Sequence, residues 1–380
     1  MHVQRRLLLG FTFIFGLLVL VGCDMSESEV PGLEPGVWNE LPGGEGTVCA
    51  DGSEYSYFAH AGDTGKLVID FQGGGACWDS LSCSSPYSNP NSNLGFGLYI
   101  NQLSPGDVMT DNPQGIYDRA NGENPVGDWN HVYVPYCTGD LHIGNATQSY
   151  TDPQTEEAYE IEHKGAVNAQ AALDWTFETF SEPEAVFITG CSAGAYGSAY
   201  WTATIEAQYP DTPIYQLGDC GAGVASDAFT ATIASSWNAS ATLPNTTFDA
   251  DAVTNTYVDT LEGSDSLKMA QYNSLFDDVQ TFFYAFGTGA DLPPSAEVAS
   301  EWSETMLTSM NTIEGSSDDF TAYISLADDD NNLNNGTQHC IIGAENFYDV
   351  ETDGVNFRDW LDDYVNGRKI ESVKVTQGEE

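Results

Sequence analysis

Residues 185–194 have the sequence AVFITGCSAG, an apolar run followed by a glycine-rich turn. The apolar part is typical of a buried parallel strand. Residues 195–209 follow, rich in Ala, Tyr and Trp, and predict a helix. Gly-x-Ser-x-Gly between a strand and a helix is typical of a nucleophile elbow, where small residues allow a sharp turn that exposes the serine hydroxyl. Ser192 is therefore the candidate nucleophile of an esterase-type reaction.

Other short apolar runs alternate with longer helical patterns, which predicts an α/β fold with a mostly parallel central sheet flanked by helices. The chain beyond residue 36 carries no second linker, so one large domain is expected over residues 37–380. Residues 221–265 are rich in Ser, Thr, Ala and Asn and predict an inserted cap-like segment. Strands are predicted at residues 67–71, 131–135, 213–217, 267–272 and 320–326, and helices at residues 162–180 and 355–365.

The first residues predict export. Arg5 and Arg6 precede an apolar run to Gly22, so residues 1–22 have the pattern of a signal peptide. The sequence LVGC at residues 20–23 has the form of a bacterial lipobox, which makes Cys23 the expected lipid attachment site. The alternative is an ordinary signal peptide with a chance cysteine. Residues 23–36 are polar with Pro and Gly, as in a flexible tether. We expect an extracytoplasmic lipoprotein that contacts the membrane through its lipid.

The charge of the chain is extreme. It has 10 basic and 57 acidic residues, a formal net charge of −47. The acids are scattered, so they predict a solvated acidic surface over an ordinary core. Such a surface repels nucleic acid, which is excluded as a partner. Because high ionic strength screens this self-repulsion, a saline habitat is the hypothesis.

Cysteine usage agrees with an oxidising compartment. Apart from Cys23 there are seven cysteines, an odd number, so at least one thiol is free or pairs elsewhere. Cys77 and Cys83 are close enough in sequence to form a disulfide, and the other pairings cannot be deduced. The Cys and His residues lack the spacing of a zinc site, so no metal is expected.

A serine nucleophile needs a base, and the base needs an acid that orients it. In a hydrolase with a nucleophile elbow, the chain order is Ser, then Asp or Glu, then His. His339 is the only histidine of six that follows Ser192, so it is the candidate base. Asp277 and Asp278 follow one predicted strand, and residues 328–330, all Asp, follow the next. His339 also follows that later strand, so the earlier pair is preferred as the source of the acid.

The oxyanion of an acyl-transfer intermediate needs backbone amides aimed at one point. One is expected from Ala193, directly after the nucleophile. Residues 67–78 have the sequence LVIDFQGGGACW, a strand followed by three glycines whose missing side chains leave the backbone open to a substrate.

Five ordered motifs together resemble the pectin acetylesterase family. The likeness spans roughly residues 40–345, nearly all of the chain beyond the tether. The motifs are GGGAC at residues 73–77, PYCTGD at 135–140, GCSAG at 190–194, FDDVQ at 276–280 and QHC at 338–340.

This resemblance implies an α/β-hydrolase fold, a Ser-Asp-His triad and ester hydrolysis with no cofactor. The family's acid lies three positions before a glutamine, which selects Asp277 over Asp278. The implied oxyanion hole comprises the amides of Gly74, Gly75 and Ala193. Other members often have Trp between the glycines and the cysteine. This chain has Ala at position 76 and Trp at position 78, so the acyl pocket is expected to differ in shape.

The predicted function is a secreted serine carboxylesterase that hydrolyses O-acyl esters, foremost O-acetyl esters of extracellular polysaccharide. The anionic surface repels polygalacturonate at low salt, so neutral acylated glycans or small-molecule esters are equally consistent substrates. One alternative is a lipase-like or longer-chain deacylase, which a deep apolar pocket would favour. Another is a catalytically silent surface binding lipoprotein, against which the complete set of candidate triad residues argues.

Overall fold

The computed structural model describes residues 30–89, 91–104, 113–264, 266–326 and 338–375. The predicted signal peptide, Cys23 and the acidic residues 328–330 lie outside these ranges. Among the residues described, no helix combines the length and the apolar character that crossing a membrane requires.

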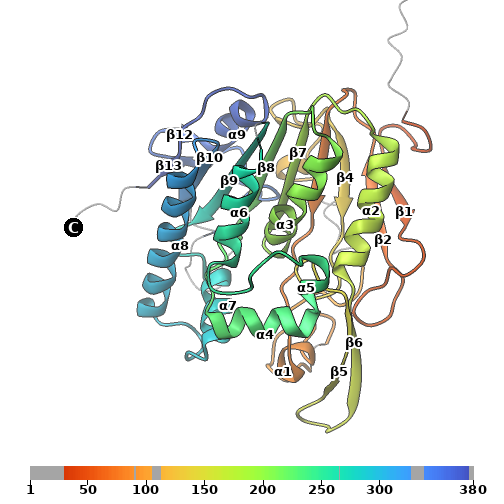
Figure 1. The fold of residues 1–380 in the computed structure, drawn as a ribbon, viewed down its shortest axis with the longest axis vertical. Coiled ribbons are helices and arrows are strands. Elements are labelled where there is room, and N and C mark those ends of the chain that lie inside the picture. Colours follow the sequence, from red (N-terminus) through yellow and green to blue (C-terminus); the bar gives the residue numbers. More distant parts are fainter. Residues whose placement is uncertain (1–29, 90, 105–112, 265, 327–337, 376–380) are drawn as a thin grey trace, which may run out of the picture.

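The described residues form a nine-stranded sheet with the order β1-β2-β4-β3-β7-β8-β9-β10-β13 (Figure 1). β1 and β4 both pair antiparallel with β2, and every other neighbouring pair in the sheet is parallel. The strands are β1 (Trp38–Pro42), β2 (Ser56–His60), β3 (Leu67–Phe71), β4 (Asn130–Val134), β7 (Val186–Cys191), β8 (Ile214–Asp219), β9 (Leu267–Ser274), β10 (Phe320–Ser325) and β13 (Val373–Lys374).

Helices cover both faces of this sheet because its strands are apolar on both faces. Ile69 of β3 packs into the cluster that holds α2, α3, α6 and α8, and Val68 packs into the cluster that holds α9. Figure 1 shows the first four helices side by side in front of the sheet. The bounds of the five helices are α2 (Gly165–Thr179), α3 (Ala193–Gln208), α6 (Ala252–Glu262), α8 (Ala296–Ser316) and α9 (Phe357–Val365). The predicted fold class is confirmed.

Shorter elements gather near the carboxyl ends of the parallel strands. α4 and α7 supply side chains to the cavity described below. The remaining elements are α1 (Ser80–Cys83), the 3-10 turn η2 (Gly115–Tyr117), α4 (Asp227–Trp237), α5 (Ala239–Thr242), α7 (Asp278–Thr288), the hairpin β5 (Ala146–Thr151) and β6 (Ala158–His163), and the pair β11 (Glu351–Thr352) and β12 (Val355–Asn356).

Each predicted strand is present with its bounds within two residues of the prediction, the hairpin of β5 and β6 was not predicted, and two helices start later than predicted. The helix predicted from residue 162 begins at Gly165, because residues 158–163 form β6. The helix predicted from residue 355 begins at Phe357, after β12.

Residues 221–265, predicted as a cap, hold α4, α5 and α6. Of these, α6 packs against α3 and α8 within the helical layer.

Candidate active site

The predicted nucleophile lies at the tight turn between β7 and α3. Ser192 has φ 57° and ψ −121°, a left-handed backbone conformation that is uncommon for a residue with a side chain, and α3 begins at Ala193. The flanking glycines are sterically required. A Cβ on Gly194 would lie 1.8 Å from the carbonyl oxygen of Phe71, and a Cβ on Gly190 would lie 2.4 Å from the carbonyl oxygen of Gly194. The turn therefore has the nucleophile-elbow geometry that the motif predicts.

The predicted base and acid are in direct contact. Nδ1 of His339 lies 2.8 Å from Oδ2 and 3.0 Å from Oδ1 of Asp277. Asp277 is fully buried, caps the N-terminus of α7 and accepts the Gln280 amide at 2.8 Å. Nε2 of His339 is buried and has no hydrogen-bond partner among the described residues. The imidazole is thus held at one nitrogen and open at the other.

Asp277 and His339 stabilise each other's charged form. Burial acts to raise the pKa of Asp277, but the charge and hydrogen bond of His339 and the two hydrogen bonds of Gln280 together outweigh burial, and the pKa lies below its ordinary value. Burial acts to lower the pKa of His339, but the charge and hydrogen bond of Asp277, together with the charge of Asp219, outweigh burial and the pKa is raised. The alternative acid Asp278 is the first residue of α7, one position beyond the carboxylate that touches the histidine. The structure therefore brings His339 together with Asp277.

The glycine turn packs directly on the elbow. A Cβ on Gly73 would lie 2.5 Å from the carbonyl oxygen of Cys191 and 3.0 Å from the Cβ of Ser192, so this position must be glycine. Gly75 and Ala193 line one cavity together with Ser192, and Gly74 and Gly75 line a second cleft that Ser192 also lines. The residues predicted for an oxyanion hole thus surround the predicted nucleophile.

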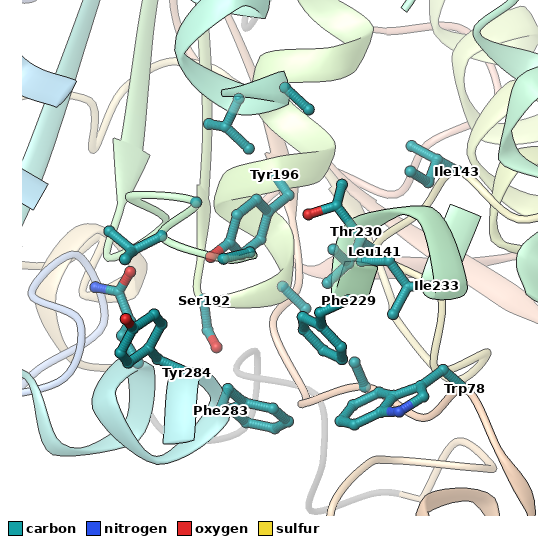
Figure 2. A pocket seen from close by; sticks show the side chains of 18 of the residues that line it. Trp78, Leu141, Ile143, Ser192, Tyr196, Phe229, Thr230, Ile233, Phe283 and Tyr284 are labelled. Atoms are coloured by element: carbon teal, nitrogen blue, oxygen red, sulfur yellow. The ribbon is translucent and has the colours of Figure 1, made fainter. Parts of the chain in front are cut away.

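An apolar cavity of about 110 Å³ opens beside Ser192. Figure 2 shows the serine with Tyr196, Phe229 and Phe283 around it. Trp78 closes one side and packs edge-on against Phe229 at 4.8 Å between ring centroids. The other apolar lining residues include Leu141, Ile143, Ile233, Ala234, Phe248, Val253 and Trp302. Most of these side chains come from α4, α6, α7 and α8, and they lack a sequence pattern that distinguishes them from ordinary core residues.

A cleft of about 830 Å³, more polar than the apolar cavity, is also lined by Ser192 and His339. Its walls carry side-chain amides and two carboxylates, which come from Glu345 and Asp349. Among the described residues that line it, none is Lys or Arg. The amides belong to Gln72, Gln114, Gln338 and Asn346. Ser192 therefore lies where an apolar cavity meets a polar cleft.

Three disulfides are present among the described residues: Cys49–Cys137, Cys77–Cys83 and Cys191–Cys340. The second is the pairing that the sequence suggested. The third joins the residue before Ser192 to the residue after His339.

Cys220 is a buried free thiol, and burial raises the pKa of this thiol. Each of the three described clusters of Cys, His and Asp with metal-ligand spacing contains a cysteine already bonded in a disulfide.

The chain is similar to known proteins in both sequence and fold. The family model for pectinacetylesterase matches residues 41–274. Palmitoleoyl-protein carboxylesterase notum2 of Xenopus laevis is 28% identical over 154 residues, which is 40% of this chain. Palmitoleoyl-protein carboxylesterase NOTUM of Schmidtea mediterranea is 24% identical over 163 residues, which is 42% of this chain. Each alignment spans 28% of the relative's own length.

The structural match to a known protein covers more of this chain than the sequence alignments do. The structure of the Wnt deacylase Notum from Drosophila has a TM-score of 0.61 and 16% identity to this chain. The match covers 88% of this chain and 95% of the Drosophila chain. This likeness supports the α/β-hydrolase architecture.

Proposed function

The chain belongs to the pectinacetylesterase family, and from this premise we propose that it is a serine carboxylesterase that hydrolyses O-acyl esters. Ser192 is the nucleophile, His339 the base and Asp277 the acid in this proposal. The observation that carries it is the contact of His339 Nδ1 with Asp277, 2.8 Å long, beside a cavity that Ser192 and His339 both line.

The proposed reaction is acyl transfer to water. Nε2 of His339, which has no partner among the described residues, takes the proton of Ser192 as its oxygen attacks the ester carbonyl. The amides of Gly74, Gly75 and Ala193 hold the oxyanion at the N-terminus of α3, where the helix dipole favours negative charge. His339 returns the proton to the leaving alcohol, and water then attacks the acyl-enzyme by the same route. The carboxylate of Asp277 stabilises the imidazolium in both steps.

The apolar cavity supports acyl groups larger than acetyl. An engineered cavity of ~150 Å³ holds benzene, so about 110 Å³ suits a chain of roughly four to six carbons. Burying one methylene contributes about 0.8 kcal/mol, or roughly fourfold in kcat/KM. The cavity thus favours the longer-chain alternative over strict acetylesterase activity.

The cavity proposal is tested with p-nitrophenyl esters from acetate to palmitate. Ala234 lines the cavity from α4, and Ala231 is exposed on the same helix. Wild type should prefer butyrate or hexanoate to acetate. Ala234→Phe should lower kcat/KM for hexanoate at least tenfold and spare acetate, and Ala231→Phe should change neither. A wild-type preference for acetate would restore the acetylesterase assignment.

The polar cleft supports a neutral alcohol as the other half of the substrate. Glu345 and Asp349 add negative charge to a cleft whose described lining has no Lys or Arg. An acylated neutral glycan or small ester therefore fits better than an acylated polyuronate at low salt. Raising the salt from about 0.05 M to 2 M should accelerate hydrolysis of acetylated polygalacturonate far more than that of an acetylated neutral glycan. Equal salt effects on both polymers would contradict this preference.

Export and lipid anchoring at Cys23 are also proposed. The three disulfides support an oxidising compartment, and the LVGC motif supports the anchor. Cys23→Ala in the full chain should move the protein from the membrane fraction to the soluble fraction. Unchanged membrane association of that variant would remove the anchor from the proposal.

A further inference from the structure

Asp219 is a buried carboxylate beside the candidate triad that the reaction above does not use. It is the last residue of β8 and is fully buried. Its side chain accepts the backbone amide of Ile341 at 2.8 Å and that of Ile342 at 2.9 Å. These amides lie two and three residues after His339, so the carboxylate ties the segment that carries the base to the sheet.

The same residue also holds the elbow. The backbone carbonyl of Asp219 accepts the amide of Ser192 at 2.8 Å. One residue therefore bonds the nucleophile residue through its main chain and the segment of the base through its side chain. A displacement of about 1 Å between catalytic groups can cost about a hundredfold in rate, so this double attachment bears directly on the reaction.

We propose that Asp219 is a positioning residue that fixes His339 relative to Ser192 and adds negative charge behind the imidazole. The proposal rests on the function assigned above to these two residues. Both amides donate to Oδ2, and the amide of Ile341 also lies 3.0 Å from Oδ1, so the ionised carboxylate, which only accepts, suits this pair of donors. Its charge also raises the pKa of His339, in addition to the larger effect of Asp277.

The surroundings of this carboxylate make its charge depend on pH near neutrality. Burial raises the pKa of Asp219 to about 7, against the amides of residues 341 and 342 and the charge of His339, which lower it. The titratable groups that face it are His339 and Asp277 from the triad, the Cys220 thiol, and two tyrosines, Tyr272 of β9 and Tyr117 of η2.

The test is Asp219→Asn, assayed with p-nitrophenyl butyrate across pH. The amide side chain offers one acceptor and directs an N–H at a backbone donor. We expect kcat to fall about tenfold to a hundredfold with little change in KM. Loss of the negative charge should also move the acid limb of kcat/KM to lower pH, because the pKa of His339 falls. A purely structural role would lower Tm and leave that limb in place.

Asp140→Asn is the matched control. Asp140 is equally buried, accepts the amide of Gly165 at 2.7 Å, and has a pKa that burial raises to about 6. This variant should lose stability without moving the acid limb. A folded Asp219→Asn with wild-type kcat and an unmoved acid limb would overturn the proposal.

A second variant covers the case in which Asp219→Asn does not fold. Asp219→Glu keeps the charge and changes its reach, so kcat should fall while the acid limb stays at its wild-type pH. Wild-type kcat in folded Asp219→Glu would count against positioning. Ser192→Ala is measured alongside: activity in that variant would refute the proposed function itself, whatever the residue at position 219 does.

Discussion

Removing the Cys191–Cys340 disulfide and removing the Cys49–Cys137 disulfide should lower stability nearly equally, but only the first should lower turnover. The bond closes 149 residues, and in the chain-entropy treatment its loss costs about 5.1 kcal/mol. The Cys49–Cys137 bond closes 88 residues, worth about 4.6 kcal/mol on the same basis. The double variants Cys191→Ala/Cys340→Ala and Cys49→Ala/Cys137→Ala should therefore lose nearly equal stability. Only the first pair adjoins predicted triad residues.

The two variants should differ in turnover. Without its disulfide, the segment that carries His339 keeps the Asp219 contacts but loses its covalent tie to the elbow. We expect kcat per folded molecule to fall at least tenfold, since small displacements of catalytic groups are costly. The Cys49–Cys137 bond joins segments that carry no predicted triad residue, so its removal should leave kcat within about threefold.

The assay combines urea unfolding with kcat on p-nitrophenyl butyrate. Reactive sites are counted with a fluorophosphonate, and both variants are measured well below their unfolding midpoints. Equal kcat values for the two variants would refute the geometric role. A free energy of unfolding that differs between them by more than about 2 kcal/mol would refute the entropic estimate.

Three further predictions concern the acid, the elbow and the surface. Asp277→Asn should lower kcat about 10⁴-fold, by analogy with the same change in serine proteases, while Asp278→Asn should retain most activity; equal losses would contradict the assignment. Gly194→Ala should destabilise the protein by about 3 kcal/mol or more, because its Cβ would lie 1.8 Å from Phe71 O. Gly315→Ala, in α8 with open space around its Cβ, should be neutral or stabilising by up to about 1 kcal/mol. Tm should rise between about 0.05 M and 2 M salt, since screening relieves repulsion among 57 acids; a flat profile would remove the saline-habitat hypothesis.

The elbow, the parallel sheet and the triad candidates could be predicted because each has a local or ordered signal. Gly190 and Gly194 are required by the close backbone contacts of a nucleophile elbow. The sequence motif is therefore enough to predict the turn. His339 followed from chain order alone. The hairpin β5–β6 was missed, because β5 alternates between half-buried and exposed residues and lacks an apolar run.

The remaining features depend on contacts between distant segments. Cys191 and Cys340 are 149 residues apart, and spacing alone does not identify them as partners. Asp219 is one of 57 acidic residues, and only its place at the end of a parallel strand could have singled it out. The cavity is built by aromatic side chains from several helices, each of which has the pattern of an ordinary core helix.

In the proposed reaction, the meeting of the cavity and the cleft at Ser192 gives the two products separate exits. After the alcohol departs through the cleft, the acyl group stays on the serine with its chain in the cavity. The emptied cleft then receives the second nucleophile, and its amide-lined walls suit a hydroxylated molecule as well as water. An acceptor alcohol at high concentration would compete with hydrolysis and leave carrying the acyl group. The ratio of transferred ester to free acid would then measure which molecule occupies the cleft at the moment of deacylation.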